Sequence, residues 1–237
     1  MQKLSNLVQN AYTKLAFRLD TTRIFFDKPK FDYQPLPWVG IKDASLRGVE
    51  TFNRWQAIIK YIPKSARTVK DIGCCVGFFC HSAVESGLYA VGIDNNERFL
   101  RIARYVQSKL GNGDNEVFIN ISISPDNVSI VPRTDVTILL SIWHHWVFSF
   151  GLERATLMLQ EVWASTNMAL IFESGEEEVA EEFNLPFQGV ASDWLEAYLK
   201  KALSQSEIVR LGTFEAASYP HYKIKNHRRT VFIVKKT

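Results

Sequence analysis

The sequence predicts an α/β protein whose mostly parallel sheet ends in an antiparallel hairpin. From residue 68 onward, short apolar runs with strand character alternate with segments of helical periodicity, which is typical of a parallel sheet with right-handed crossovers. A glycine turn follows the first run, as expected between a strand and a helix. The last two runs are joined by a connection too short and polar for a crossover helix, so they are expected to pair antiparallel at the sheet edge.

The individual elements follow from these patterns in chain order. The first five strands are expected at residues 68–72, 89–94, 116–122, 135–141 and 167–173. Between them, helices are expected at residues 77–86, 96–110 and 152–164. A long polar segment that contains Pro186 then leads to two further strands, at 207–213 and 230–235, which completes a seven-stranded sheet.

Residues 1–46 are expected to form an N-terminal helical and extended cap, and residues 47–237 the main domain. Leucines and other apolar residues recur at helical spacing through residues 4–19 and predict an amphipathic helix. We favour packing of this helix on the domain. Weak contact with an anionic membrane surface is the alternative, disfavoured because the helix carries few basic residues. A second helix is expected around residues 48–61.

The composition limits which classes of protein this chain is expected to belong to. A chain of 237 residues with 46% apolar and 22% charged residues can bury a full sheet. No apolar run approaches the 18 residues of a membrane span and no signal peptide is recognisable, so a cytoplasmic location is expected. Cys74, Cys75 and Cys80 surround one turn, which argues against a disulfide framework. No second Cys/His pair accompanies them, so no metal is expected, and a net charge of +3 is too small to indicate nucleic acid.

The glycine turn and its two acids discriminate between nucleotide ligands. A dinucleotide fingerprint would place glycines at positions 75 and 78, where this chain has Cys75 and Phe78, and no P-loop lysine follows. Asp71 lies before the turn and Asp94 at the end of the next strand, so a pyrophosphate would be repelled. This arrangement suits a ligand with an ammonium group near the turn and a ribose at Asp94. S-adenosylmethionine is such a ligand.

The motif Asp71-Ile-Gly-Cys-Cys-Val-Gly77 resembles the first motif of class I S-adenosylmethionine-dependent methyltransferases, with Cys75 in place of the middle glycine. Gly73–Phe79, Ser141–His145 and a late Leu211-Gly-Thr-Phe with Arg229-Thr-Val-Phe look most like the methyltransferases of O-antigen chain ends and the tRNA wobble-uridine carboxymethyl transferases. The resemblance runs from roughly residue 47 to the C-terminus. It implies a Rossmann-like fold and these cofactor-binding residues: Asp71, Gly73, Cys74, Gly77, Asp94, Asn95, Ser122 and Ser141.

The segment Ser141-Ile-Trp-His-His-Trp146 follows the fourth strand, where methyltransferases usually meet cofactor and acceptor. Histidine can remove a proton from a hydroxyl near neutral pH, so His144 or His145 is the candidate base, with His145 slightly preferred. A packing or capping role for either is the alternative. Trp143 and Trp146 are candidates for stacking on the acceptor or facing the sulfonium, or else pack in the core. The Asn/Asp-Pro-Pro-Tyr signature of amino-group methylation is absent, which favours an oxygen acceptor.

Two charged runs leave alternatives open. The acidic run of residues 173–182 is expected to begin a helix and to be solvated, and no ligands for a catechol-type metal follow the fourth strand. The basic stretch from Lys223 to Arg229 is either a solvated edge or a site for a phosphate or carboxylate of the acceptor. In the second interpretation, Arg229 binds substrate.

The sequence therefore predicts an S-adenosylmethionine-dependent methyltransferase that acts on an oxygen of a glycan or of another hydroxylated or phosphorylated acceptor. Two rivals remain open. One is an RNA-modifying methyltransferase, for example of tRNA, which would need a larger basic surface. The other is a non-catalytic protein that uses the same fold only to bind a cofactor.

Overall fold

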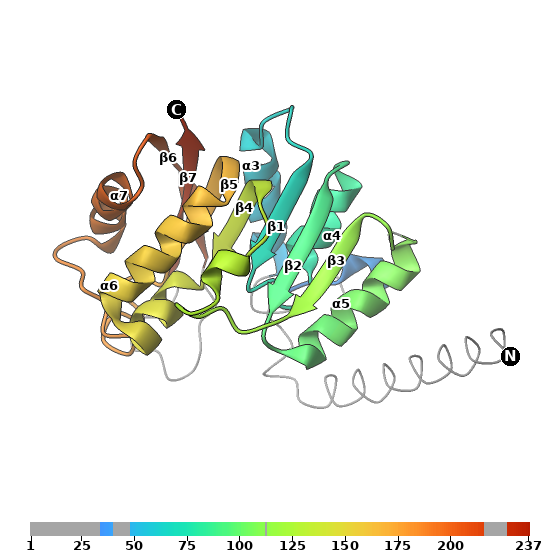
Figure 1. The fold of residues 1–237 in the computed structure, drawn as a ribbon, viewed down its shortest axis with the longest axis horizontal. Coiled ribbons are helices and arrows are strands. Elements are labelled where there is room, and N and C mark those ends of the chain that lie inside the picture. Colours follow the sequence, from blue (N-terminus) through green and yellow to red (C-terminus); the bar gives the residue numbers. More distant parts are fainter. Residues whose placement is uncertain (1–33, 40–47, 112, 216–226) are drawn as a thin grey trace, which may run out of the picture.

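The computed structural model describes residues 34–39, 48–111, 113–215 and 227–237. Its centre is one seven-stranded sheet in the order β3-β2-β1-β4-β5-β7-β6, whose strands lie side by side in Figure 1. The strands are β1 (Thr68–Ile72), β2 (Tyr89–Asp94), β3 (Glu116–Asn120), β4 (Thr134–Leu140), β5 (Thr166–Glu173), β6 (Ser206–Glu215) and β7 (Arg228–Lys236). The first five pair in parallel, and β7 pairs antiparallel with both β5 and β6. The predicted fold class is confirmed, whereas the predicted N-terminal helix lies outside the described residues.

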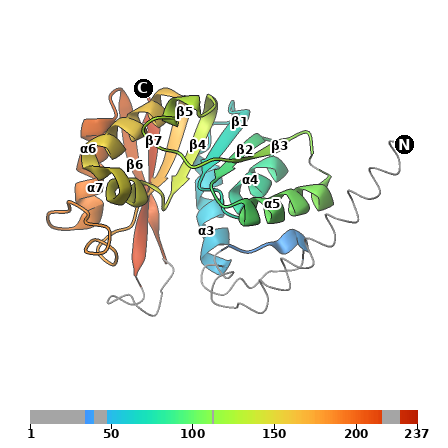
Figure 2. The ribbon, with the colours of Figure 1, turned by 60° about the horizontal axis from the view of Figure 1, so that its bottom comes forward.

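Helices cover both faces of the sheet, as Figures 1 and 2 show. One face carries α3 (Gly48–Ile58), α4 (Phe78–Glu85) and α5 (Glu97–Leu110), and the other carries α6 (Trp143–Ala164) and α7 (Ala191–Ala202). Short 3-10 turns lie at Pro37–Val39, Ile59–Tyr61 and Val128–Ile130. Because both faces are covered, the central strands β4 and β5 are buried over most of their length, which explains the apolar runs 138–140 and 168–172 within them.

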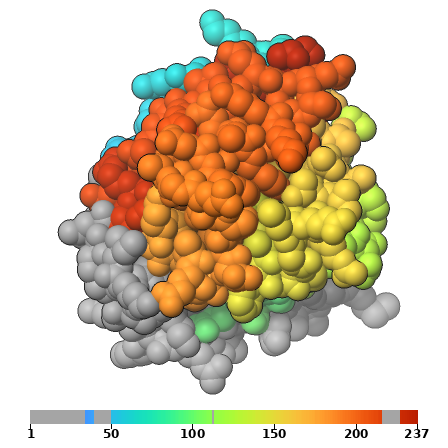
Figure 3. Space-filling view, turned by 90° about the vertical axis from the view of Figure 1, so that its left-hand side faces the viewer, coloured from blue at the N-terminus to red at the C-terminus, as the bar shows by residue number. Residues whose placement is uncertain are grey.

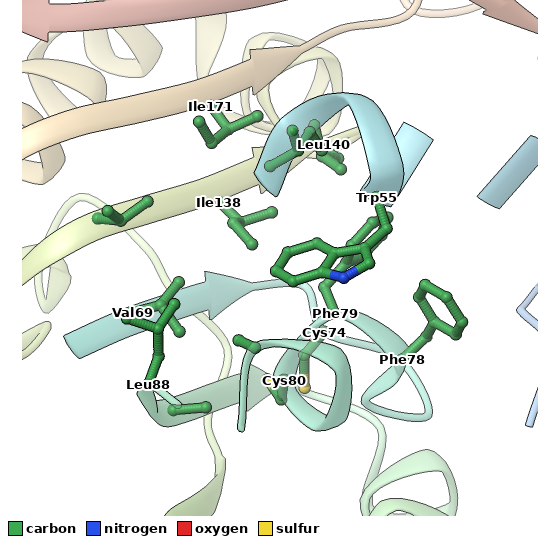
Figure 4. Packing of buried hydrophobic residues seen from close by; sticks show 14 of the residues in the cluster. Trp55, Val69, Cys74, Phe78, Phe79, Cys80, Leu88, Ile138, Leu140 and Ile171 are labelled. Carbon is green, nitrogen blue, oxygen red and sulfur yellow. The ribbon is translucent and has the colours of Figure 1, made fainter. Parts of the chain in front are cut away.

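The core on the α3–α5 side consists of aromatic and small apolar side chains. Figure 4 shows Trp55 and Phe79 packed together with Cys74 and Cys80 in this cluster. All three cysteines are free and buried, so they act as small apolar residues of the core.

The α6 side differs from the sequence prediction in three ways. First, α6 begins at Trp143 rather than near residue 152, and Gly151 interrupts it with φ 80° and ψ 160°, a conformation that favours glycine. Second, α7 was not predicted, although its buried Leu195 and Leu199 stand four residues apart. Figure 3 shows α7 lying against α6 on this side of the molecule. Third, the acidic run after β5 forms turns instead of starting a helix.

None of the described helices is both long enough and apolar enough to cross a lipid bilayer.

Candidate active site

The turn between β1 and α4 is built from left-handed backbone. Gly73 has φ 79° and Gly77 has φ 84°, and a β-carbon at position 73 would lie 2.2 Å from Cδ1 of Ile142. Cys75 adopts φ 53° although it is not glycine, and its amide donates a 2.8 Å hydrogen bond to Oδ2 of Asp94. The turn is therefore held against the end of β2 by the residue that departs from the usual glycine motif.

Asp71 and Asp94 are brought to the same end of the sheet by the parallel register of β1 and β2, in which Asp71 pairs with Gly92. Asp71 is 3% exposed, and its Oδ2 has no hydrogen-bond partner within the described part of the chain. Burial, together with the nearby charge of Asp94, raises the pKa of Asp71 to about 8. Burial also raises the pKa of Asp94, although backbone amides, including those of Cys75 and Asn96, oppose this effect.

A cavity of about 320 Å³ opens at this end of the sheet, which is within the range of small-molecule sites. Its lining residues are Ile72, Gly73, Ile93, Asp94, Asn95, Ile121, Ser122, Ile123, Ile142, His145, Trp146, Ser149 and Phe150. The wall is mostly apolar, Asp94 is the one acid among these lining residues, and none of them is lysine or arginine. Such a wall does not suit a pyrophosphate and does suit a cationic nucleoside.

The predicted site residues divide into two groups. The cavity wall contains Gly73, Asp94, Asn95, Ser122, His145 and Trp146. The other group lies outside the wall and consists of Asp71, Cys74, Gly77, Ser141, Trp143, His144 and Arg229. Within this second group, Cys74 packs in the core and Gly77 begins α4.

The two histidines have different surroundings. His144 is buried, and its Nδ1 accepts a 2.9 Å hydrogen bond from the amide of Gly175, so this nitrogen carries no proton and the ring is neutral. His145 is exposed to the cavity, and its ring centroid lies 4.4 Å from that of His144 and 4.8 Å from that of Phe183. Burial among these rings, followed by the charge of Arg229, lowers the pKa of His145 below its ordinary 6.5. His145 is therefore uncharged near neutral pH and faces the cavity.

The two tryptophans also have different surroundings. Trp143 is completely buried, and its indole N–H donates to the hydroxyl of Tyr198 at 3.1 Å. Trp143 therefore packs α6 against α7, and its position does not support the predicted contact with the acceptor. Trp146 is 5% exposed and forms part of the cavity wall.

A buried network of ions connects the ends of β4, β5 and β7. The hydroxyl of Ser141, whose φ is 61°, donates to Oε1 of Glu173 at 2.7 Å and accepts from Nη1 of Arg229 at 2.9 Å. Arg54 on α3 pairs with Oε2 of Glu173 at 3.0 Å, and Nε of Arg229 donates to Oε1 of Glu178 at 2.5 Å. Ser141 and Arg229 thus bond to the protein itself, where sequence reasoning expected them to bind cofactor and substrate.

Part of the acidic run belongs to this network, contrary to the expectation of a solvated helix start. Glu176 accepts from the amide of Thr230 at 2.6 Å, and Glu178 contacts Nε2 of His227 at 2.7 Å. Burial acts to raise the pKa of Glu178, but the bonds from His227 and Arg229 outweigh it and lower that pKa. The lowered pKa keeps Glu178 ionised beside the buried Arg229. Burial instead raises the pKa of Glu176, although the bonds from Thr230 oppose this effect.

One triad offers metal-ligand chemistry, since ligand atoms of Glu176, Glu177 and His227 lie within 4.8 Å of one another. Each is already engaged: Glu176 with Thr230, Glu177 with the amide of Ala191, and His227 with Glu178. We therefore assign Glu176 and His227 to the network around Glu178 and Arg229, and the exposed Glu177 to a bond with the start of α7.

Sequence reasoning did not select Ile142, Ser149 and Phe150, which line the cavity with His145 and Trp146. Ile142 precedes α6 as its N-cap residue and the other four come from its first turns, so all five share one face at the spacing i, i+3, i+4, i+7 and i+8. That spacing was visible in the sequence, but it carries information only once residues 143–150 are known to be helical.

The raised pKa of Asp71 predicts a pH-dependent stability. The folded protein keeps this carboxyl protonated up to about pH 8, whereas the unfolded chain releases the proton near pH 3.8. The free energy of unfolding should therefore fall as pH rises between these values, by at most about 1.4 kcal/mol per pH unit from this group. Urea unfolding at pH 5 to 8 should show a smaller decrease in Asp71→Asn. The exposed control Asp114→Asn should behave as the parent protein does, and an unchanged decrease in Asp71→Asn would refute the assignment.

No family model and no curated protein sequence matches the chain. Solved structures do. The bifunctional kinase-methyltransferase WbdD matches with a TM-score of 0.62 at 21% identity, over 85% of this chain and 43% of the WbdD chain. This chain therefore spans less than half the length of WbdD. The magnesium protoporphyrin IX methyltransferase ChlM from Synechocystis PCC 6803, solved with S-adenosylmethionine, matches with a TM-score of 0.57 at 15% identity, over 82% of this chain and 83% of ChlM. The chain has the fold of the class I S-adenosylmethionine-dependent methyltransferases.

Proposed function

We propose that the protein is an S-adenosylmethionine-dependent methyltransferase that methylates an oxygen of a glycan or of another hydroxylated, or phosphorylated, acceptor. The observation that carries this proposal is the electrostatic character of the cavity. Asp94 lies in its wall, Oδ2 of Asp71, which has no hydrogen-bond partner among the described residues, lies buried nearby, and no lysine or arginine lines the cavity. The fold neighbour ChlM, solved with S-adenosylmethionine and with S-adenosylhomocysteine, supports the same cofactor here.

The residues present fit this cofactor. Asp71 would accept the ammonium group, because its Oδ2 is a buried acceptor without a donor among the described residues. Asp94 would accept the ribose hydroxyls, since a carboxylate has about four acceptor positions and backbone amides use only some of them. The apolar segment 121–123 would lie against the adenine. When bound, the cofactor supplies a methyl group that a sulfonium has already activated.

The protein's own contribution is then alignment of the acceptor, exclusion of water and removal of a proton. His145 is the proposed base because it faces the cavity and is neutral near pH 7. His144 is proposed to hold the position of His145: its ring contacts that of His145 at an angle of 35°, and its Nδ1 accepts a hydrogen bond from the amide of Gly175. Trp146 and Ile142 form an apolar part of the wall that excludes water.

The two rivals predict different behaviour. An RNA methyltransferase should bind RNA with an affinity that falls steeply with added salt. Arg229, one candidate for such a basic surface, is bonded to Glu178 and is 4% exposed, while Lys223 and Lys225 lie outside the described residues. A non-catalytic protein of this fold should bind the cofactor without turnover.

Calorimetry with S-adenosylmethionine tests the cofactor assignment. The parent protein should bind it, and Asp94→Asn should bind about 10- to 100-fold more weakly because one ribose acceptor and a negative charge are lost. Asp114→Asn should bind normally, because Asp114 is exposed and precedes β3, whereas the cavity residues Ile121 and Ser122 follow the other end of that strand. Thermal melting of both variants establishes that they are folded. Equal affinity in Asp94→Asn, or binding of a nicotinamide dinucleotide in preference to S-adenosylmethionine, would disprove the proposal.

Radiolabelled methyl transfer to hydroxylated acceptors tests the base. His145→Gln should lower the rate constant about 100- to 10,000-fold without changing cofactor affinity. At saturating S-adenosylmethionine, the rate of the parent protein should fall as pH drops below about 6.5, because the pKa of His145 is lowered and the neutral form is required. His144→Asn retains an acceptor for the amide of Gly175 and should keep most activity. Normal turnover by His145→Gln would remove His145 from the mechanism.

A further inference from the structure

Three aromatic rings, those of His145, Phe148 and Phe183, form a cluster that begins at the cavity wall with His145, and we call this cluster the aromatic rim. His145 and Phe148 lie three residues apart on the first turns of α6 and so project from the same side of that helix. Phe183 comes from the segment after β5, and its ring centroid lies 4.8 Å from that of His145 and 5.6 Å from that of Phe148. The rim therefore includes His145, the side chain that is proposed to remove a proton from the acceptor.

The rim offers apolar surface to a ligand. Phe148 is 63% exposed, the largest exposed fraction among the large apolar side chains of the described residues. Its neighbours on the helix, Ser149 and Phe150, belong to the cavity wall. An exposed phenylalanine close to a small-molecule cavity can contact the ligand. A flat ring of an acceptor can cover the phenylalanine while the rest of the acceptor enters the cavity.

The charge around the rim indicates an uncharged ligand. Arg229, whose charge acts on His145, is buried and bonded to Glu178 and Ser141, so its guanidinium is already occupied by the protein. Glu182, the residue just before Phe183, is an exposed acid. A phosphate or carboxylate at the rim would therefore meet negative charge and a guanidinium that is already paired.

We propose that the acceptor is an uncharged hydroxylated ring that stacks on Phe148 and Phe183 and directs one hydroxyl toward His145. This inference rests on the proposed methyltransferase function and narrows its acceptor class, since it excludes phosphorylated acceptors. Two sources supply such a ring, a pyranose sugar and a phenol. Both present a flat face with an apolar part and a hydroxyl at the edge.

Saturation-transfer NMR on the full chain with S-adenosylhomocysteine tests the proposal. The probes are methyl β-D-glucopyranoside for the sugar source, catechol for the phenol source, and glucose 6-phosphate as the anionic counterpart. At least one uncharged probe should bind, and glucose 6-phosphate should bind more weakly than the methyl glucoside. Phe148→Ala should weaken binding of the uncharged probe about fivefold, and Phe148→Trp should restore it because a stacking face returns. Which probe binds distinguishes the two sources.

Leu157→Ala is the matched control, because Leu157 is also an exposed apolar residue of α6, at 56%, but has no ring contact with the aromatic rim and lies nine residues beyond Phe148. It should leave binding unchanged. The proposal is overturned if neither uncharged probe binds, if Phe148→Ala binds as the parent does, or if glucose 6-phosphate binds most tightly. Calorimetry of S-adenosylhomocysteine in the same samples separates the two claims. Failure of the parent to bind it contradicts the proposed function, whereas normal binding with an inert rim contradicts only this inference.

Discussion

The architecture of the site depends on two carboxylates that share one poorly solvated end of the sheet. Parallel pairing of β1 with β2 brings Asp71 and Asp94 together, and burial keeps water from screening them. Asp71 consequently retains a proton to about pH 8. A ligand that brings positive charge to this end of the sheet stabilises the ionised form of both acids. A ligand that brings phosphate adds further negative charge beside them. The preference for a cationic nucleoside thus follows from the register of two strands and the turn that closes over them.

A buried network of paired charges lies at the start of the segment that carries His145. Arg54 and Arg229 neutralise Glu173 and Glu178, and Ser141 bridges the two halves of this network. Because the network bonds α3 to the ends of β4, β5 and β7, the segment that carries His145 starts from a fixed point. A buried network of this kind contributes geometry more than net stability, since removing charges from water costs nearly as much as their pairing returns.

The sequence predicted the sheet well because strand and turn signals are local. The bounds of β1 and β2 agree with the prediction, and so does the antiparallel pairing of β6 with β7. The part of the site that would face the acceptor was harder to predict from the sequence. Gly151 interrupts α6 and hides the helical spacing of the preceding turns, and Arg229 meets Glu178 across 51 residues of sequence. Such long-range pairing decides whether a charged side chain is solvated or buried, and no local pattern reports it.

Proton release on cofactor binding tests the central electrostatic claim most directly. Calorimetry of S-adenosylmethionine binding at pH 6.5, in buffers of different ionisation enthalpy, counts the protons exchanged. If the cofactor's positive charge ionises Asp71, about one proton should be released per cofactor bound, and Asp71→Asn should release almost none. Binding without proton release by the parent protein, or equal release by both proteins, would contradict the account.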